Sequence, residues 1–343
     1  MQAKGFLRTQ LTEKASADDV NLQRGQGSTE ADDLLPGHPR VAILMCTYNG
    51  AAYLREQLES FAAQTFRNWM LYVSDDASTD DTSDILSDYK VRWGQERLVI
   101  FSGPCKGFAE NFISLVQRSE IEADYFAFSD QDDVWFNDKL KRSVDLLESA
   151  NSSIPALYCG RTRLVDADLG VIGVSPLFSK PPSFRNALVQ SLAGANTMLI
   201  NQAARRLLCR LPDRSPLIAH DWLTYLLVSG CGGQVSYDTE PCLDYRQHSG
   251  NLIGANASAR DRLVRFRKML SGRFAEWNDA NVTVLKGMEF MLTEENRGVL
   301  AHFESGRRQG VFKRVCTLRK TGIYRQTLRG NLSLMIAIWL GQV

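Results

Sequence analysis

Four short apolar segments, each followed by a helical pattern, dominate the first half of the sequence. The segments cover residues 41–46, 69–74, 98–101 and 125–128. After each one, apolar side chains recur every three or four positions, as they do on one face of an amphipathic helix. Strands that alternate with helices form a parallel sheet, because each connection returns across a face of the sheet. The sequence therefore predicts an α/β fold with a Rossmann-like, mostly parallel sheet flanked by helices.

Polar and acidic residues follow three of the four predicted strands. They are Thr47, Tyr48 and Asn49 after the first, Asp75 and Asp76 after the second, and Asp130, Asp132 and Asp133 after the fourth. Parallel sheets bind ligands beyond the carboxyl ends of their strands, so we expect one crevice to collect these side chains. Carboxylates this close repel one another unless a cation lies between them, and Mg²⁺ or Mn²⁺ prefers such ligands together with phosphate oxygens. An acidic turn that caps the next helix is the alternative for the last group.

The remainder of the chain is less regular. Strands are expected at residues 157–159 and 162–165, and a strand pair at 235–237 and 242–246. Helices are expected to begin near Asn201 and at Asp221. Residues 1–38 are polar and lack periodicity, which predicts a flexible extension. Residues 256–343 are expected to form a helical, basic C-terminal region.

Composition excludes several classes of protein. The 343 residues contain 40 basic and 39 acidic side chains, which gives no overall preference for nucleic acid. The seven cysteines form no CxxC pair, as expected for thiols in a reducing compartment rather than for a disulfide framework. No apolar run approaches the ~20 residues that span a bilayer, and the first residues have no signal-peptide core. We therefore expect a cytoplasmic protein.

Five motifs in a fixed order connect the sequence to a known family. They are residues 46–50 (CTYNG), 74–82 (SDDASTDDT), 129–135 (SDQDDVW), 220–222 (HDW) and 245–248 (YRQH). In this order they resemble the family 2 glycosyltransferases, above all the bacterial rhamnosyltransferase-like members that build O-antigen lipopolysaccharide and other surface polysaccharides. The resemblance implies a GT-A-type catalytic domain over residues 39–255, with a nucleotide half at 39–150 and an acceptor half at 151–255. It also implies an inverting, metal-dependent transfer of a hexose from a nucleoside-diphosphate sugar to a hydroxyl of a glycan.

The resemblance implies that one set of residues binds the sugar nucleotide. The set comprises Thr47, Tyr48, Asn49, Asp75, Asp76, Gly107, Asn111, Asp130 and Arg246. An Asp can accept a hydrogen bond from a pyrimidine N3–H, and a Tyr ring offers a face for stacking. N-capping of the next helix is the alternative for Asp75 and Asp76. The donor that the resemblance favours is dTDP-rhamnose, and a UDP-sugar is the alternative, since no residue separates thymine from uracil.

Asp130 and Asp132 match the DxD motif of the family. The resemblance implies that Asp132 binds Mg²⁺ or Mn²⁺ directly, that Asp130 binds the metal or the ribose, and that His248 completes the coordination. The metal would stabilise charge on the leaving nucleoside diphosphate. Asp133 would support these ligands, and Trp135 is expected to pack in the core.

Asp221 occupies the position where the family carries its catalytic base. Inversion at the anomeric carbon needs a carboxylate on the acceptor side to take the proton of the attacking hydroxyl. A helix N-terminus would keep that carboxylate ionised, although simple capping of the helix explains the local sequence equally well. His220 and Trp222 flank Asp221 and are expected on the acceptor side; for His220, a packed structural histidine is the alternative.

The C-terminal residues are strongly basic. From Ser305 onward there is no acidic residue, and the cations are Arg307, Arg308, Lys313, Arg314, Arg319, Lys320, Arg325 and Arg329. An apolar run at 334–340 lies on a predicted helix together with Leu328 and Leu332. Basic and apolar side chains together favour docking on an anionic membrane surface, which would place the protein peripherally on the inner face of the cytoplasmic membrane, near a lipid-linked acceptor. Packing on the core, or against a second copy, is the alternative.

Three other functions compete with this interpretation. A sugar nucleotidyltransferase would carry a glycine-rich phosphate loop with a basic residue after the first strand, whereas here no cation occurs between that strand and Arg55. A Ca²⁺-binding module of the EF-hand type fails, because a loop counted from Asp130 places Trp135 at the glycine position and Lys141 at the bidentate position. A catalytically inactive, nucleotide-sugar-binding scaffold stays open on sequence alone.

Overall fold

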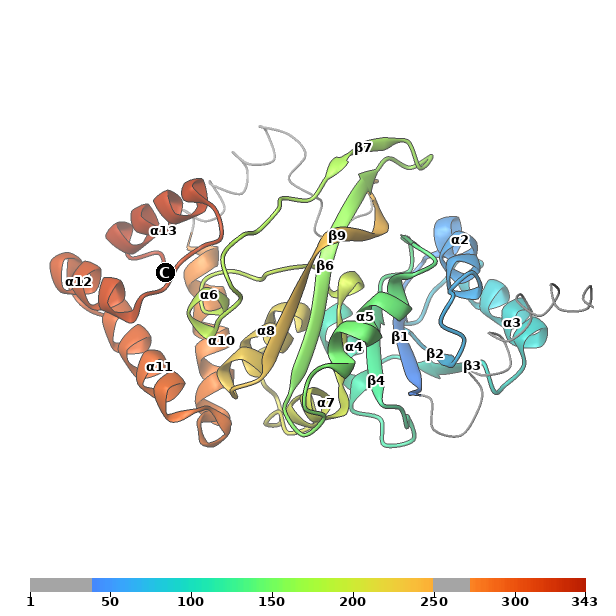
Figure 1. Ribbon diagram of the computed structural model, residues 1–343, viewed down its shortest axis with the longest axis horizontal. Helices are drawn as coiled ribbons and strands as arrows, with labels where there is room; N and C mark the ends of the chain where they lie inside the picture. Colours follow the sequence, from blue (N-terminus) through green and yellow to red (C-terminus); the bar gives the residue numbers. More distant parts are fainter. Residues whose placement is uncertain (1–38, 249–271) are drawn as a thin grey trace, which may run out of the picture. The chain divides into compact units, whose positions relative to one another are not determined.

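The computed structural model describes residues 39–248 and 272–343, and its central feature is a nine-stranded sheet (Figure 1). The first half of this sheet contains β1 (Val41–Thr47), β2 (Trp69–Asp75), β3 (Leu98–Ser102) and β4 (Tyr125–Ser129). These strands lie in the order β3-β2-β1-β4 and are all parallel. The four predicted strands are confirmed. β1, β2 and β4 are buried on both faces, as their apolar runs suggest, whereas β3 ends the strand order and is half-buried.

The second half of the sheet is mixed. It comprises β5 (Val134–Trp135), β6 (Ala156–Val165), β7 (Val171–Val174), β8 (Leu199–Asn201) and β9 (Gln234–Arg246). β8 joins the two halves, antiparallel to both β4 and β6, whereas β6 and β9 run parallel. β5 and β7 add antiparallel pairs at β9 and β6. The α/β class is therefore confirmed, with a sheet that is parallel in the nucleotide half and mixed as a whole.

Two predictions for the second half are wrong in detail. β6 is one strand where two were expected, and β9 is one strand where a strand pair was expected. β9 runs parallel to β6 along its length, and the register shifts where Arg161 meets Pro241. Pro241 has no N–H to give to the ladder, so the polar residues before it form an irregularity inside the strand rather than a hairpin turn.

Helices cover both faces of the sheet. One face carries α2 (Ala51–Ala62), α3 (Thr82–Trp93) and α5 (Lys139–Glu148), and the other carries α4 (Phe108–Val116), α7 (Gln202–Leu208) and α8 (His220–Gly230). This division follows from the alternation of side chains along a strand. Val41, Ile43 and Met45 of β1 pack with the first group, whereas Ala42 and Leu44 pack with the second. Each face thus has its own apolar core.

Further helices form the C-terminal region. They are α10 (Arg273–Gly287), α11 (Glu294–Arg307), α12 (Val311–Thr321) and α13 (Leu328–Leu340), with the 3-10 turn η2 (Glu289–Met291). The short α6 (Phe184–Ala187) and the 3-10 turn η1 (Ala195–Thr197) lie earlier, between β7 and β8. Figure 1 shows α10 to α13 grouped beyond α8, and Phe274, Leu300 and Ile338 share the core of α4 and α8. The expected helical C-terminal region is confirmed. Within the described ranges, no helix combines the length and the apolar character needed to cross a bilayer.

The predicted domain boundaries stay predictions. Residues 1–38 and the border between 255 and 256 lie outside the described residues. The chain from Pro39 to Val343 forms one compact unit. The nucleotide half, the acceptor half and the C-terminal region are therefore best regarded as parts of that unit.

Candidate active site

The loops after β1, β2 and β4 meet at one edge of the sheet. β1 lies between β2 and β4, although β2 and β3 separate β1 from β4 in the sequence. The chain thus leaves β1 on one side and returns to β4 on the other, which creates the switch point at which open α/β sheets bind ligands. Thr47 ends β1 at this point, and Asp130 follows β4 beside it. The structure therefore brings the first, second and third motifs together.

Side-chain hydrogen bonds hold the loop after β1 against the loop after β2. The Asp75 carboxylate accepts from Oγ1 of Thr47 (2.8 Å) and from the N–H of Ser78 (3.0 Å). Asn49 has a φ of 49°, and its Oδ1 accepts from the N–H of Thr79 at 2.8 Å. Asp75 and Asn49 therefore brace these two loops against each other.

The helix-capping alternative for Asp75 and Asp76 is wrong. α3 begins at Thr82, and its N-cap residue is Asp81, whose side chain makes no capping hydrogen bond. The Asp80 carboxylate accepts instead from the N–H of Thr82 at 3.1 Å. The two earlier aspartates therefore act within the loops at the sheet edge.

A cavity of about 300 Å³ lies beside the carboxyl ends of β2 and β3. Its lining combines the apolar side chains of Leu86, Ile100 and Phe101 with Asp75. Cys105 also lines it, and the N–H of Cys105 donates to Oδ1 of the neighbouring Asp76 at 2.6 Å. An apolar wall with a few acceptors suits a flat, partly apolar group such as a nucleobase.

Asn111 and Gly107 shape the loop that leads into α4. Nδ2 of Asn111 donates to the backbone oxygen of Ser74 at 3.1 Å, while its buried Oδ1 has no partner in the described part of the chain. A Cβ atom on Gly103 would lie 2.5 Å from Oδ1 of Asp76 and 3.0 Å from Oδ1 of Asn111. Gly107 has a φ of +90°, which favours glycine at the start of α4. Close backbone approach therefore requires small residues here.

Tyr48 is the exposed aromatic residue of the site. Its side chain is 60 % exposed, so the ring is available to a ligand. Its backbone is held by Gln131, whose Oε1 accepts from the N–H of Tyr48 (2.9 Å) and whose Nε2 donates to the Tyr48 oxygen (3.1 Å). Gln131 lies between the two DxD carboxylates. The DxD loop and the loop after β1 are thus fixed to each other.

Asp130 lies at the end of β4 among other carboxylates. Burial raises the pKa of Asp130 to about 7, and the charges of Asp132 and Asp221 add to this shift. Oδ2 of Asp132 lies 2.8 Å from Nε2 of His248. The charge of Asp221 on α8 therefore contributes to the raised pKa of a carboxyl in the DxD loop.

The side chains at this point match part of what a divalent cation requires. In residues 39–248 and 272–343, no group of three or more His, Cys, Asp or Glu side chains is arranged to hold a metal ion. Asp132 and His248 supply an oxygen and a nitrogen in contact, and the charge of Asp132 disfavours ionisation of Asp130. A cation here relieves that repulsion, and donor phosphates supply the remaining ligands. Asp132 and His248 fit this role as a pair, and the metal site with Asp130 as a third ligand stays a prediction.

A buried network beneath the DxD loop fixes its position. Asp133 is 1 % exposed; its Oδ2 accepts from Nδ2 of Asn196 (2.6 Å) and its Oδ1 from the N–H of Arg246 (3.2 Å). The N–H of Asp133 donates to Oε1 of Gln57 at 3.0 Å. Burial raises the pKa of this carboxyl well above its ordinary value. Trp135 is 3 % exposed and packs in the core, as predicted.

Arg246 supports the same loop from the end of β9. Its Nε donates to the backbone oxygen of Asp132 at 2.9 Å, and its terminal nitrogens contact the oxygen of Ala167 and the carboxylate of Glu56. The guanidinium also lies over the ring of Tyr53, 4.4 Å from its centre. These contacts make Arg246 a positioning residue for the DxD loop. Its expected contact with a diphosphate stays a prediction.

Asp221 lies in the first turn of α8. The N-cap residue of this helix is Ala219, so Asp221 does not hold the capping position. Its Oδ1 accepts from the N–H of Trp222 at 2.7 Å, and its Oδ2 lies 3.5 Å from Oγ of Ser191. Burial raises the pKa of Asp221 to about 6. A carboxylate with this pKa is ionised at neutral pH and basic enough to accept a proton.

The residues on either side of Asp221 point into the core. His220 is 2 % exposed and stacks on Phe112 with 3.9 Å between ring centres. Trp222 is 6 % exposed, and its Nε1 donates to the backbone oxygen of Ala187 at 2.6 Å. Burial lowers the pKa of His220 to about 3, so the imidazole is neutral. This packing favours the structural alternative for His220, and the acceptor-side positions expected for His220 and Trp222 stay predictions.

Three residues that organise the site were not identified from the sequence. Gln131, Gln57 and Asn196 each fix the DxD loop or the loop beside it. The sequence could have indicated Gln57, because it lies next to Leu58 on the apolar face of the predicted helix. An amide buried there needs a hydrogen-bond partner. The sequence could also have indicated Gln131, since it lies between the two DxD carboxylates. Asn196 offered only a turn sequence.

Comparisons with known proteins find one matching family and several related sequences. The model of glycosyl transferase family 2 matches residues 42–191. The dTDP-rhamnosyl transferase RfbG of Shigella flexneri is 30 % identical over 232 residues, which are 64 % of this chain and 77 % of that protein. The UDP-Glc:alpha-D-GlcNAc-diphosphoundecaprenol beta-1,3-glucosyltransferase WfaP of Escherichia coli is 29 % identical over 145 residues, 41 % of this chain and 52 % of that protein.

A solved structure is also similar. The mannosyltransferase PcManGT from Pyrobaculum calidifontis, in complex with GDP-Man and Mn²⁺, aligns with a TM-score of 0.49 at 15 % identity, over 89 % of this chain and 86 % of that chain. The family match and the rhamnosyl transferase relative are the findings that assign the chain. On these grounds the chain belongs to glycosyl transferase family 2 and is a glycosyltransferase.

Proposed function

We propose that the chain transfers a sugar, with rhamnose favoured, from a nucleoside-diphosphate sugar to a hydroxyl of a glycan, with inversion at the anomeric carbon. The observation that carries this proposal is the gathering of the DxD loop, Tyr48 and Asp75 at the switch point of the sheet, with Asp221 in the first turn of α8. The charge of Asp221 also contributes to the raised pKa of Asp130. An inverting transfer needs a base and a donor-binding carboxylate in one crevice. The identity of 30 % to a dTDP-rhamnosyl transferase supports dTDP-rhamnose as the donor, with a UDP-sugar as the alternative.

In this proposal the donor lies along the loops after β1, β2 and β4. Tyr48 offers its exposed ring to the base, and Asp76 offers a carboxylate to the N3–H of the base. Asp130 binds the ribose or the metal, and Arg246 acts near the diphosphate. The loops around the donor are shaped by Thr47, Asn49, Asp75, Gly107 and Asn111.

Asp221 acts as the general base. The acceptor oxygen forms a bond to the anomeric carbon while the bond from that carbon to the diphosphate breaks. The hydroxyl proton passes to Asp221, and the electron pair leaves with the nucleoside diphosphate. Asp132, with Asp130 and His248, would hold Mg²⁺ or Mn²⁺, which supplies stabilisation of the charge on the leaving group.

Calorimetric binding of dTDP, UDP and GDP, with and without Mn²⁺, tests the donor assignment. We expect one pyrimidine diphosphate to bind in a metal-dependent manner, because both the base and the diphosphate have matching groups. Asp132→Ala should abolish that binding. Absence of binding to the folded protein would refute the proposed donor class.

Asp221→Asn tests the assignment of the base. The variant should bind nucleotide normally and transfer at least ~10²-fold more slowly, because an amide cannot accept the proton. Transfer is measured with the donor identified by calorimetry. Near-normal transfer by the variant would remove Asp221 as the base. Binding without any transfer by the wild-type protein would favour the catalytically inactive scaffold.

We also infer that the acceptor glycan is carried on a lipid in surface polysaccharide synthesis. The relative WfaP acts on a sugar linked to diphosphoundecaprenol, which supports a lipid-linked acceptor for this chain. Such acceptors lie in a membrane, so the protein works peripherally, on the inner face of the cytoplasmic membrane. The basic C-terminal region supports this location.

A further inference from the structure

The outer face of α13 is apolar and exposed. Its residues Leu328, Leu332, Met335 and Trp339 are 87, 65, 43 and 62 % exposed. They recur at i, i+4, i+7 and i+11, which places them on one side of the helix. Leu334, Ala337 and Ile338 on the opposite side are at most 2 % exposed and belong to the core. α13 is thus apolar on both sides, and within the described residues only the inner side is covered.

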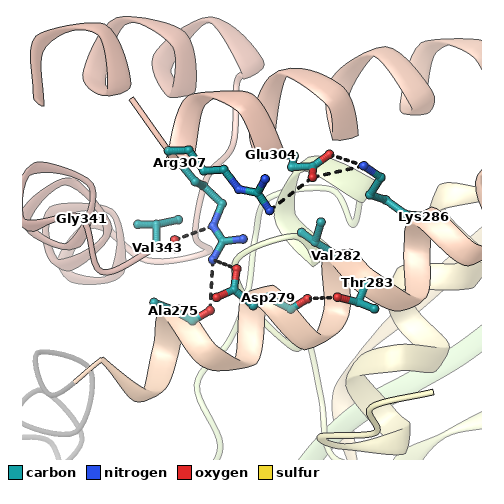
Figure 2. A pocket seen from close by; sticks show the side chains of 10 residues that line it. Ala275, Asp279, Val282, Thr283, Lys286, Glu304, Arg307, Gly341 and Val343 are labelled. Atoms are coloured by element: carbon teal, nitrogen blue, oxygen red, sulfur yellow. Dashed lines mark hydrogen bonds and ion pairs between the residues drawn. The ribbon is translucent and has the colours of Figure 1, made fainter. Parts of the chain in front are cut away.

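Half of the cations in this region are already engaged within the chain. Arg307 pairs with Asp279 (2.9 Å), Arg308 with Glu304 (3.6 Å), Arg314 donates to the Ile338 oxygen (3.1 Å) and Arg325 to the Val189 oxygen (3.1 Å). The ion pair of Arg307 and Asp279 lies at a cavity of about 400 Å³, shown in Figure 2. Residues of α10 and α11 line this cavity together with Gly341 and Val343. Lys286 and Glu304 form a second ion pair in its lining. The cations of that cavity are paired, so it offers little to an anionic ligand.

The other four cations are exposed. Lys313, Arg319, Lys320 and Arg329 form no ion pair with any residue that the structure describes. Phe312 is 89 % exposed and shares the outer side of α12 with Arg319 and Lys320. α12 packs against α13, and Arg314 links the two helices. A basic helix with an aromatic anchor, next to an exposed apolar helix, is the composition of elements that bind a bilayer surface.

We propose that the outer faces of α12 and α13 dock on an anionic lipid bilayer. The apolar residues of α13, together with Phe312, enter the headgroup boundary, and the four exposed cations contact lipid phosphates. A second copy of the chain is a poorer occupant, because it would bring the same positive charges together. Residues 249–271 are also poorer, since they carry five basic residues and one acidic residue. This inference rests on the proposed function only for the source of the lipid-linked acceptor.

Binding to vesicles tests the docking face in the full-length protein. We expect the protein to sediment with vesicles that contain phosphatidylglycerol and to bind phosphatidylcholine vesicles weakly. Leu332→Ser with Trp339→Ser should lower binding at least ~tenfold, because both side chains lose burial in the bilayer. Lys320→Gln and Arg329→Gln should each lower it about fivefold. Val91→Ser and Phe290→Ser are matched controls, with 87 and 71 % exposed side chains elsewhere, and should not change binding.

Three outcomes would overturn the proposal. They are equal binding to neutral and anionic vesicles, unchanged binding by the α13 variants, and self-association of the wild-type protein that these variants abolish. Calorimetry with dTDP on the same preparations separates the two proposals. Lost vesicle binding with intact dTDP binding refutes the docking face alone, and the reverse result refutes the donor assignment alone.

Discussion

At the scale of single residues, the imidazole of His220 is buried without a polar contact to any residue that the structure describes. It lies among the rings of Phe108, Phe112 and Phe128, and neither ring nitrogen has a partner in the described chain. Burial lowers its pKa from 6.5 to about 3. Between pH 6.5 and about 3, His220 is protonated in the unfolded chain but stays neutral in the folded chain. The stability that depends on neutral His220 is therefore complete above pH 6.5 and is lost toward pH 3, by about 1.4 kcal/mol per pH unit.

His220→Leu should therefore weaken the loss of stability in acid, as measured by urea unfolding between pH 6.5 and about 4. The raised pKa values of Asp130 and Asp221 act in the opposite sense, but they do so in both proteins, so the difference isolates His220. His302→Leu, at an exposed position, is the control and should leave the slope unchanged. Identical slopes for wild type and His220→Leu would mean that folded His220 accepts a proton in mild acid.

At the scale of elements, Gln131 couples the end of β4 to the end of β1. Gln131→Ala removes both of its hydrogen bonds to the Tyr48 backbone, so the segment that carries the exposed ring is no longer tied to the DxD loop. We expect dTDP affinity to fall about five- to tenfold, since each bond contributes about 0.5–1.5 kcal/mol and the loop is partly exposed. The melting temperature should change little, because the loop contributes little burial. Calorimetry and thermal unfolding measure the two effects.

Gly50→Ala is a second way to break the hydrogen bonds between Gln131 and the Tyr48 backbone. A Cβ atom at Gly50 would lie 2.3 Å from Oε1 of Gln131, so the amide must move away from Tyr48. Gln117→Ala is the matched control, because it also removes one glutamine bond to a backbone oxygen, that of Leu208, in another part of the fold. Full dTDP affinity in both Gln131→Ala and Gly50→Ala would show that the position of Tyr48 does not matter for binding.

The elements that the sequence predicted well are those fixed by burial. β1 to β4 are nearly continuous apolar runs, and their helices have clear apolar stripes, so local pattern and tertiary position agree. β9 failed because its polar middle resembles a turn. In the fold, Asp238 accepts from the hydroxyl of Tyr158 at 2.9 Å, and Arg142 donates to the oxygen of Pro241 at 3.1 Å. These distant partners keep a polar segment extended, and no local pattern reveals them.

At the scale of the whole molecule, the order of the motifs predicts that Asp221 shares a crevice with the DxD loop, and the contribution of Asp221 to the raised pKa of Asp130 supports this prediction. The same motif did not reveal that the side chains of His220 and Trp222 are buried. Successive residues on a helix point about 100° apart, so when Asp221 faces the crevice its neighbours face elsewhere. Which way they face depends on Phe112 and Ala187, which lie far away in the sequence.

The DxD loop is held from both halves of the sheet, and Asn196 is, with Arg246, one of the contacts from the second half. Asn196→Ala leaves Oδ2 of the buried Asp133 without the amide that it accepts from at 2.6 Å. We expect urea unfolding to show a loss of about 1–3 kcal/mol, the cost of an unsatisfied buried group. Nucleotide affinity should fall as well, because Asp133 is then held less firmly and the neighbouring Asp132 is less well positioned.

The matched control is Asn278→Ala. Asn278 is also 1 % exposed, but its amide has no partner in the described chain, so the substitution removes the same atoms without breaking a bond. Its effect on the free energy of unfolding should be smaller than that of Asn196→Ala. If the two variants lost equal stability and Asn196→Ala kept full nucleotide affinity, Asn196 would not support the DxD loop. Arg246 would then be the residue of the second half of the sheet that positions the loop, through its bonds to Asp133 and to the Asp132 oxygen.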